Sequence, residues 1–256
     1  MSVIEIKTPA EIARMRRAGA LAAQALAAVL EAVAPGVTTA ALDHLAETFI
    51  RDHGASPSFK GYRGFPGSIC VSVDDEVVHG IPGPRRLRAG SIVSIDLGVY
   101  LDGFHADLAR TVPVGQVDGA TQRLLVVTEE ALAAGIAEAC ARRTTGDIGH
   151  AIQRVVERAG FSVVRDLAGH GVGRALHEGP ELPNFGAAGG GVPLQVGMTL
   201  AIEPMVNAGG VKVTVDADGW TVRTRDAARS AHAEHTVAVG AEGADVLTGL
   251  PVAAPI

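Results

Sequence analysis

Helical and strand-like segments follow one another in the same order twice along this chain: two helices, then several short strands. Thr39 and Thr145 begin comparable helices 106 positions apart (145 minus 39), and strand-like runs rich in Val and Ile come after each. Such a repeat favours two similar halves, because helix pairs and strands bury their apolar faces against each other. The alternative is an ordinary α+β chain in which the same order arises by coincidence.

Local signals place the helices. Thr8 and Glu11 form a capping box around Pro9, which predicts a helix start, and the Pro35-Gly36 pair predicts its end. Three further helices are expected to begin at Thr38, Asp118 and Asp147.

Strand-like runs fill the segments between and after the helices. The first half contains SICVSV, SIVSIDLGVY and FHADLARTVPV, and the second contains FSVV, MTLAIEPMV, VKVTV, GWTVRTRD and AEHTVAVG. The turn Leu101-Asp102-Gly103 joins two of these runs and predicts an antiparallel hairpin. The fold class expected is therefore α/β (α+β).

Composition narrows the class of protein. With 256 residues, 47% of them apolar, the chain can bury a large core, and we expect residues 1–256 to form a single domain. The net charge of −6 and the lack of a long basic run argue against nucleic-acid binding. Cys70 and Cys140 make no disulfide framework, and neither a signal peptide nor a membrane span is evident, so a cytoplasmic location is expected.

Five polar residues stand in apolar or glycine-rich surroundings where an unpaired charge is costly. Asp96 and Asp107 lie on the two arms of the predicted hairpin, and Glu203 and Glu234 lie in strand-like runs of the second half. His170 adds an imidazole from the segment GHGVG. Four carboxylates and one imidazole, with no thiolate near them, favour two hard or borderline divalent ions over a structural zinc.

Each of these residues also has a plainer interpretation, as a hairpin residue, a strand-end charge or a hydrogen-bonded histidine. The five together are what point to a metal centre. His79 and His177 lie beside glycine and proline turns, where the backbone can approach a ligand, and are expected in the same site. The chain has no G-x-S-x-G, no H-E-x-x-H and no P-loop, so serine-hydrolase, zincin and nucleotide chemistry are disfavoured.

At these residues the chain resembles the methionine aminopeptidases of the bacterial type I form. The matching segments span nearly the whole length: KTPAEIARMRRAG, GYRGFPGSICVSVDDEVVHGIP, DGFHAD, GFSVVRDLAGHGVG, MTLAIEPMVNAG, DGWTVRTRD and AEHTV. The resemblance implies the pita-bread fold, in which two pseudo-symmetric α/β halves enclose a metal site. It also implies removal of an N-terminal methionine that precedes a small residue, by attack of a metal-activated water.

The resemblance further assigns roles to individual residues. It implies five metal ligands, Asp96, Asp107, His170, Glu203 and Glu234, for two divalent ions (Co, Mn, Fe or Zn) that Asp107 and Glu234 bridge. Glu203 would also shuttle a proton, and His79 and His177 would contact the substrate. The pocket for the methionine side chain would be walled by Tyr62, Phe65, Cys70 and Trp220.

The expected partners are the N-terminal methionine of nascent polypeptides and the ribosome exit region, with no nucleic acid and no membrane, and the chain is expected to be a monomer. It departs from the usual family pattern at Phe59, Leu108, Leu176 and Gly179, and in the loop Gly189-Gly190-Gly191. The first, third and fourth of these are expected near the pocket, and Leu108 replaces a threonine that could bond near the metal.

Three alternatives remain open. An X-Pro dipeptidase or aminopeptidase P shares the fold and metal set but usually has an extra N-terminal domain, for which this chain has no room. A type II methionine enzyme needs a helical insertion, and only 26 positions (203 minus 177) separate His177 from Glu203. A metal-free binding module of the same fold would have no reason to keep all five ligands.

Overall fold

The computed structural model describes residues 4–249. Within them the helices are α1 (Pro9–Glu31), α2 (Thr39–Asp52), the 3-10 turn η1 (Tyr62–Gly64), α3 (Gly119–Ala137) and α4 (Thr145–Arg158). The strands are β1 (Ser56–Pro57), β2 (Cys70–Val73), β3 (Glu76–Val78), β4 (Ile92–Leu101), β5 (Phe104–Pro113), β6 (Ser162–Val163), β7 (Ala168–Gly171), β8 (Glu178–Pro183), β9 (Thr199–Ile202), β10 (Met205–Asn207), β11 (Val213–Val215), β12 (Val222–Thr224), β13 (Ser230–His232), β14 (Glu234–Val239) and β15 (Ala244–Val246).

The helix starts follow the capping signals. The Thr8 hydroxyl accepts a hydrogen bond from the amide of Glu11, and the Glu11 carboxylate accepts one from the amide of Thr8. The predicted capping box is therefore present at α1. Thr38 caps α2 as expected. α4 begins at Thr145, as the repeat predicted. The start predicted at Asp147 is two residues late, because Asp147 is the third helical residue and closes a capping box with Thr144.

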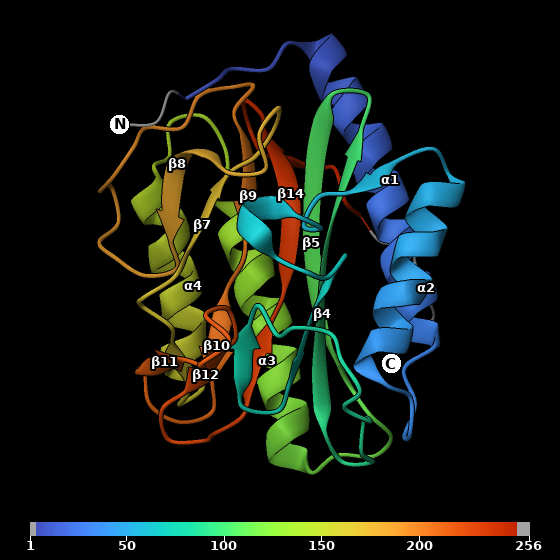
Figure 1. Ribbon diagram of the computed structural model, residues 1–256. Helices are drawn as coiled ribbons and strands as arrows, with labels where there is room; N and C mark the ends of the chain where they lie inside the picture. The colour runs from blue at the N-terminus through green and yellow to red at the C-terminus, as the bar shows by residue number, and fades with distance from the viewer. Residues whose placement is uncertain (1–3, 250–256) are drawn as a thin grey trace.

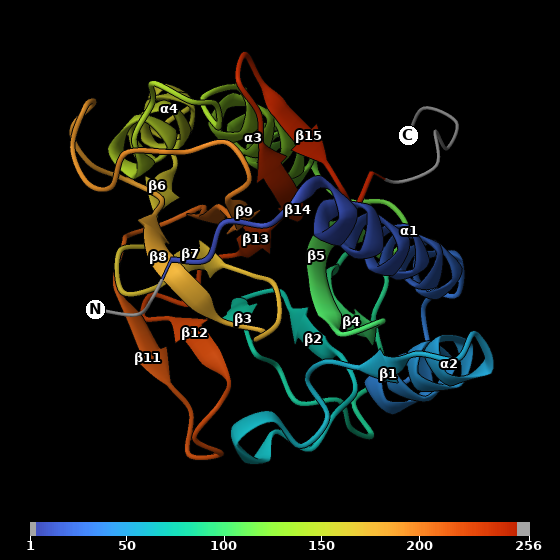
Figure 2. The same cartoon turned by 90° about the horizontal axis from the view of Figure 1, so that it is seen from above.

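A nine-stranded sheet joins the two halves of the chain. Its main path runs β1-β4-β5-β14-β9-β7-β8, with β2 on β4 and β15 on β14. Figure 1 shows α1 and α2 to the right of these strands, α4 to their left and α3 behind them. Seen from above, both helix pairs lie along the outer side of the curved sheet, while the shorter strands gather on its inner side (Figure 2). The predicted order of two helices followed by strands therefore occurs in both halves.

Two apolar clusters attach the helix pairs to the sheet. Ile95 and Leu97 of β4 pack with α1 and α2, whereas Leu200 and Val237 pack with α3 and α4. Asp96 lies between Ile95 and Leu97, so strand alternation turns its side chain to the inner side. The helices thus leave the inner face free for polar groups. None of the helices in residues 4–249 combines the length and the apolar character that a membrane span requires.

Candidate functional site

Strand register brings three of the predicted acids to one face of the sheet. The hairpin β4–β5 pairs Asp96 with Ala109 and Gly98 with Asp107, and β14 pairs Glu234 with the same Ala109. Because residues opposite each other share a face, all three carboxylates point to the inner side. The predicted hairpin is thus present, and it meets the second half at β14.

The hydroxyl of Thr236 ties the two halves together beside these acids. Its oxygen accepts from the amide of Asp107 at 2.9 Å and donates to the carbonyl of Asp107 at 2.8 Å. The side chain of Thr236 is fully buried, so water has no access to these groups. A side chain here takes the place of a backbone ladder bond between β5 and β14.

His170 and Glu203 complete the group from strands β7 and β9. His170 pairs with Ala201, and Glu203 follows the last residue of β9. A Cβ at Gly169 would lie 2.4 Å from the carbonyl oxygen of Ala201, and one at Gly171 would lie 2.1 Å from the carbonyl oxygen of Gly179. The glycines on both sides of His170 therefore allow β7 to fit between β8 and β9.

The ligand atoms of these residues fall into two overlapping groups. Donor atoms of Asp107, His170 and Glu234 all lie within 4.8 Å of one another, and so do those of Glu203, His232 and Glu234. His170 Nε2 lies 3.5 Å from Glu203 Oε1. Glu234 belongs to both groups and so stands at the centre of the cluster. Asp96 is in neither group but lines the same cavity.

Burial makes this concentration of negative charge unfavourable. It raises the pKa of Asp107 to about 7. Burial, followed by the charges of neighbouring acids, raises the pKa of Asp96, Glu203 and Glu234 well above their usual values. A bound cation would remove this penalty, since it supplies the opposite charge that the surrounding protein lacks.

His170 is prepared to offer a lone pair. Its Nδ1 lies 2.8 Å from the carbonyl oxygen of Gly171, and because a carbonyl only accepts, Nδ1 carries the proton and Nε2 keeps its lone pair. Burial lowers the pKa of His170 to about 4, so the ring is neutral near pH 7. Both properties are those of a metal-binding imidazole.

The unsatisfied atoms of the site test whether a metal fits. Within residues 4–249, buried oxygens of Asp96, Asp107 and Glu234 have no hydrogen-bond partner. Buried polar atoms are nearly always bonded, so these three need a further partner. Oxygen donors supplemented by one imidazole suit divalent ions such as Mn, Fe, Co or Zn. The residues present therefore fit the implied metal.

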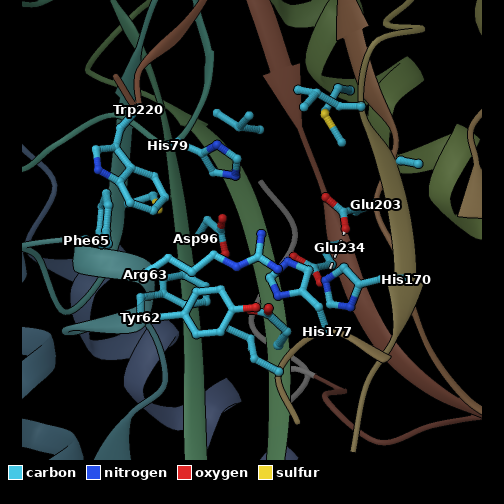
Figure 3. Close-up of a pocket in the computed structure, with 18 residues that line it drawn as sticks. Tyr62, Arg63, Phe65, His79, Asp96, His170, His177, Glu203, Trp220 and Glu234 are labelled. Carbon is cyan, nitrogen blue, oxygen red and sulfur yellow. Dashed lines mark ion pairs between the residues drawn. The ribbon is translucent and has the colours of Figure 1, made fainter. Parts of the chain in front are cut away.

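A cavity of about 210 Å³ opens onto this cluster. The Phe65 and Trp220 rings meet edge to face at 5.1 Å between centroids, and His79 lies 6.3 Å from the Trp220 ring. The rings of Tyr62 and His177 stack with their centroids 5.2 Å apart. Figure 3 shows Phe65 and Trp220 on one side of the opening, Glu203 and Glu234 on the other, and Asp96 between them. Its lining contains every residue expected from the sequence: Tyr62, Phe65, Cys70, His79, Asp96, Asp107, His170, His177, Glu203, Trp220 and Glu234.

Sequence reasoning missed His232. Its side chain is buried, neither ring nitrogen has a hydrogen-bond partner within residues 4–249, and Nε2 lies 3.7 Å from Glu203 Oε2. A usable signal was present, because His232 stands two residues before Glu234 and alternation favours the same face. His235, which follows Glu234, bonds through Nδ1 to Thr248 Oγ1.

The departures from the family pattern have defined places. Phe59 and Leu176 line the cavity, as expected, with Cys70 and Phe65 in one apolar cluster. Leu108 is buried in the apolar cluster beneath α1 and α2, so its side chain faces away from the acids.

The glycine loop 189–191 packs on the start of α4. Gly189 donates to an Asp147 oxygen at 2.9 Å, and the amide of Gly146 donates to the carbonyl of Gly190 at 3.0 Å. These bonds tie the loop to the first turn of the helix. The loop therefore supports α4. The sequence alone did not indicate this role for the loop.

Comparison with known proteins supports the resemblance. Residues 13–241 match the model of metallopeptidase family M24. Methionine aminopeptidase of Clostridium perfringens and methionine aminopeptidase 1 of Bacillus subtilis are each 51% identical to this chain over 246 residues, covering 96% of this chain and 99% of theirs. The crystal structure of methionine aminopeptidase from Rickettsia prowazekii superposes with a TM-score of 0.95 at 43% identity, covering 96% of this chain and 100% of that one.

A more distant match separates fold from activity. The Xaa-Pro dipeptidase from Bacillus anthracis superposes with a TM-score of 0.77 at 24% identity, and the chain covers 62% of its length. This likeness shows the fold alone. The pita-bread fold expected from the resemblance is therefore confirmed, and the chain belongs to metallopeptidase family M24 and, within it, to the methionine aminopeptidases.

Proposed function

We propose that this chain is a metal-dependent aminopeptidase that removes the N-terminal methionine of proteins and peptides whose second residue is small. One observation carries the proposal: four buried acids and a neutral histidine converge on a cavity whose other wall is aromatic. The first group suits divalent cations and the second suits an apolar side chain with a polarisable sulfur. Family membership supports the same activity.

In this proposal two divalent ions would be held by Asp96, Asp107, His170, Glu203 and Glu234. Glu234 belongs to both groups of close donor atoms, which suits a bridging role. When bound, the cations would lower the pKa of a water and polarise the scissile carbonyl. The candidate ions are Co, Mn, Fe and Zn, and a metal titration compares them.

The protein's own groups bind the peptide and move the proton. Glu203 lines the cavity beside the other acids, so its carboxylate would accept a proton from the attacking water and pass it to the departing amine. Desolvation by the surrounding cavity, followed by the neighbouring His170 and Arg63, lowers the pKa of His177, so this ring would donate to the carbonyl oxygen without adding a charge. His79, whose ring lies 6.3 Å from that of Trp220, would bond the departing amide region.

The methionine side chain would occupy the aromatic side of the cavity, among Tyr62, Phe65, Cys70 and Trp220. Thioether sulfur makes favourable contacts with ring edges, which the edge-to-face pair of Phe65 and Trp220 offers. Burial and nearby acids raise the pKa of Cys70 well above its usual value, so its thiol stays neutral and suits an apolar wall. The side chains that crowd the acids in this cavity support a preference for a small second residue.

Further expectations belong to the same proposal. We take residues 1–256 to act as one catalytic unit, supported by a sheet that contains strands of both halves. The chain would work as a monomer in the cytoplasm, on nascent polypeptides near the ribosome exit, without binding nucleic acid or membrane.

One assay tests the reaction. Protein stripped with a chelator is given Mn, Co, Fe or Zn in steps, and release of methionine is measured from Met-Ala, Met-Gly, Met-Leu and Met-Lys peptides. We expect no release before metal is added, a rise that levels off at two ions per chain, and preference for Ala and Gly. Cleavage of Ala-Pro or Gly-Pro in preference to these peptides would overturn the proposal in favour of an X-Pro peptidase.

A matched pair of variants tests the metal centre without relying on turnover. Glu234→Gln should lose bound metal in a direct titration, because Glu234 belongs to both donor groups. Asp245→Asn removes the same charge from an exposed site and should bind metal as the wild type does. Equal metal binding by both variants would contradict the assignment. A protein that turns over fully without metal would refute the centre altogether.

A further inference from the structure

An arginine lies at the mouth of the cavity. Arg63 belongs to the turn η1 and lines the cavity together with the acids and aromatic rings. Its backbone has φ 49°, in the left-handed region, between Gly61 at φ 83° and Gly64 at φ 90°. Figure 3 shows the side chain extending from the aromatic side of the opening toward His177. A left-handed conformation at a non-glycine residue is uncommon, and such residues concentrate at functional sites.

The charge of the Arg63 side chain is unpaired in the described part of the chain. Within residues 4–249 no carboxylate lies within 4.0 Å of the Arg63 guanidinium, whereas Arg85 and Arg223 each pair with Glu76. The contact that Arg63 does make is with the Tyr62 ring, 5.3 Å from its centroid. A guanidinium over an aromatic face is held in place but keeps its donors free for another group.

The charge of Arg63 is unmatched at the cavity. The residues that line it include no other lysine or arginine. With two divalent cations the four acids of the centre would be balanced, so Arg63 would leave the mouth positive. A positive mouth attracts an acidic group on the substrate.

The position of Arg63 indicates which part of a peptide it meets. In the proposed function, methionine lies against Phe65 and Trp220 and the scissile bond lies at the acids. Arg63 stands with Tyr62 and His177 at the opening, where the rest of the peptide leaves. The second residue is small, so the first side chain long enough to reach the guanidinium belongs to the third residue.

We propose that Arg63 is a specificity-determining residue that favours substrates with an acidic side chain at the third position. This inference rests on the proposed function. The carboxylate of an aspartate or glutamate would accept from the guanidinium, and a lysine there would be repelled. Exposed ion pairs of this kind are weak, so we expect a preference of about threefold to tenfold in kcat/KM between glutamate and lysine.

The test uses the metal-loaded enzyme and three peptides, Met-Ala-Glu, Met-Ala-Gln and Met-Ala-Lys. All carry a C-terminal amide, which removes the terminal carboxylate as a competing partner for Arg63. We expect kcat/KM to fall in the order Glu, Gln, Lys for the wild type. Arg63→Gln should level the three values, and Arg63→Glu should reverse the order.

A control variant and a binding measurement separate charge recognition from general damage. Arg142→Gln removes an exposed arginine from the surface pair with Glu242 and should keep the wild-type order. Trp220 is the single tryptophan of the chain and lines the cavity, so its fluorescence reports binding of peptides whose scissile carbonyl is reduced to a methylene. The glutamate analogue should bind more tightly than the lysine analogue, and the difference should shrink at high salt.

The outcomes distinguish a failure of the role of Arg63 from a failure of the aminopeptidase function. Equal cleavage of the three peptides by the wild type, or a glutamate preference that survives in Arg63→Glu, would overturn the role of Arg63 and leave the aminopeptidase function standing. Failure to release methionine from any of the three would overturn the proposed function and this inference with it. Reversal of the order by Arg63→Glu supports both.

Discussion

The buried ion pair of Lys7 and Glu178 connects the N-terminal segment to the residue next to His177. The Lys7 ammonium bonds the Glu178 carboxylate, and their side chains are 1% and 10% exposed. Removing one partner of such a pair leaves the other charge buried without compensation, which costs about 3–5 kcal/mol. The amide of Ala175 still donates to Glu178 at 3.0 Å, so we expect the lower end of that range.

The perturbation is Lys7→Met, which keeps the length of the side chain and removes its charge. We expect it to lower the free energy of unfolding by about 3 kcal/mol. Glu178→Gln should cost less, about 2 kcal/mol, because Glu5 Oε2 lies 3.5 Å from the Lys7 ammonium and compensates it in part. The double variant should cost less than the sum of the two, since neither charge is then left alone.

The assay is urea unfolding of chelator-treated protein, followed by circular dichroism, so that metal binding does not mask the differences. The exposed pair Arg16–Asp245, with side chains 49% and 48% exposed, is the matched control. Arg16→Met and Asp245→Asn should each change stability by less than about 1 kcal/mol. The reasoning is refuted if the Lys7 and Glu178 effects are strictly additive, because a buried pair must show coupling.

Two further predictions concern the strands of the site. Gly171→Ala would place a Cβ 2.1 Å from the Gly179 carbonyl oxygen and should lower the free energy of unfolding in urea by about 3 kcal/mol. Gly119→Ala is the control, because a Cβ there would meet no atom within 4 Å, and equal effects of the two variants would contradict the close approach at Gly171. Thr236→Val removes the hydroxyl that bonds both the amide and the carbonyl of Asp107, and should lower the free energy of unfolding by about 2–4 kcal/mol in the same assay. A change below about 0.5 kcal/mol would show that water replaces the hydroxyl.

Local signals in the sequence determined what could be predicted of the fold. The capping box at Thr8 and the cap at Thr38 act within a few residues, and both were placed correctly. The Asp102-Gly103 turn likewise gave the β4–β5 hairpin, with Asp102 at φ 51° and Gly103 at φ 86°. β7 was not predicted, because glycines on both sides of His170 remove the side chains by which a strand is recognised.

The candidate site could be predicted in part for a different reason. A carboxylate inside an apolar strand is costly wherever the strand lies, so Asp96 and Glu234 stood out before any pairing was known. His232 did not, because a buried histidine has many ordinary explanations. Arg63 was also missed, since nothing in the sequence reveals that its guanidinium lacks an acidic partner.

The meeting of the two halves depends on register, which no local pattern contains. Glu234 faces Ala109 across 125 positions (234 minus 109), and only two residue pairs join β14 to β5 before the Thr236 hydroxyl takes over. A slip of one residue would turn Glu234 toward the helices and bring His235 to the inner face. Thr236 prevents that slip, because its hydroxyl satisfies both the amide and the carbonyl of Asp107 at one register only. The same contact that joins the halves therefore also sets the spacing of two of the acids proposed to hold the metals.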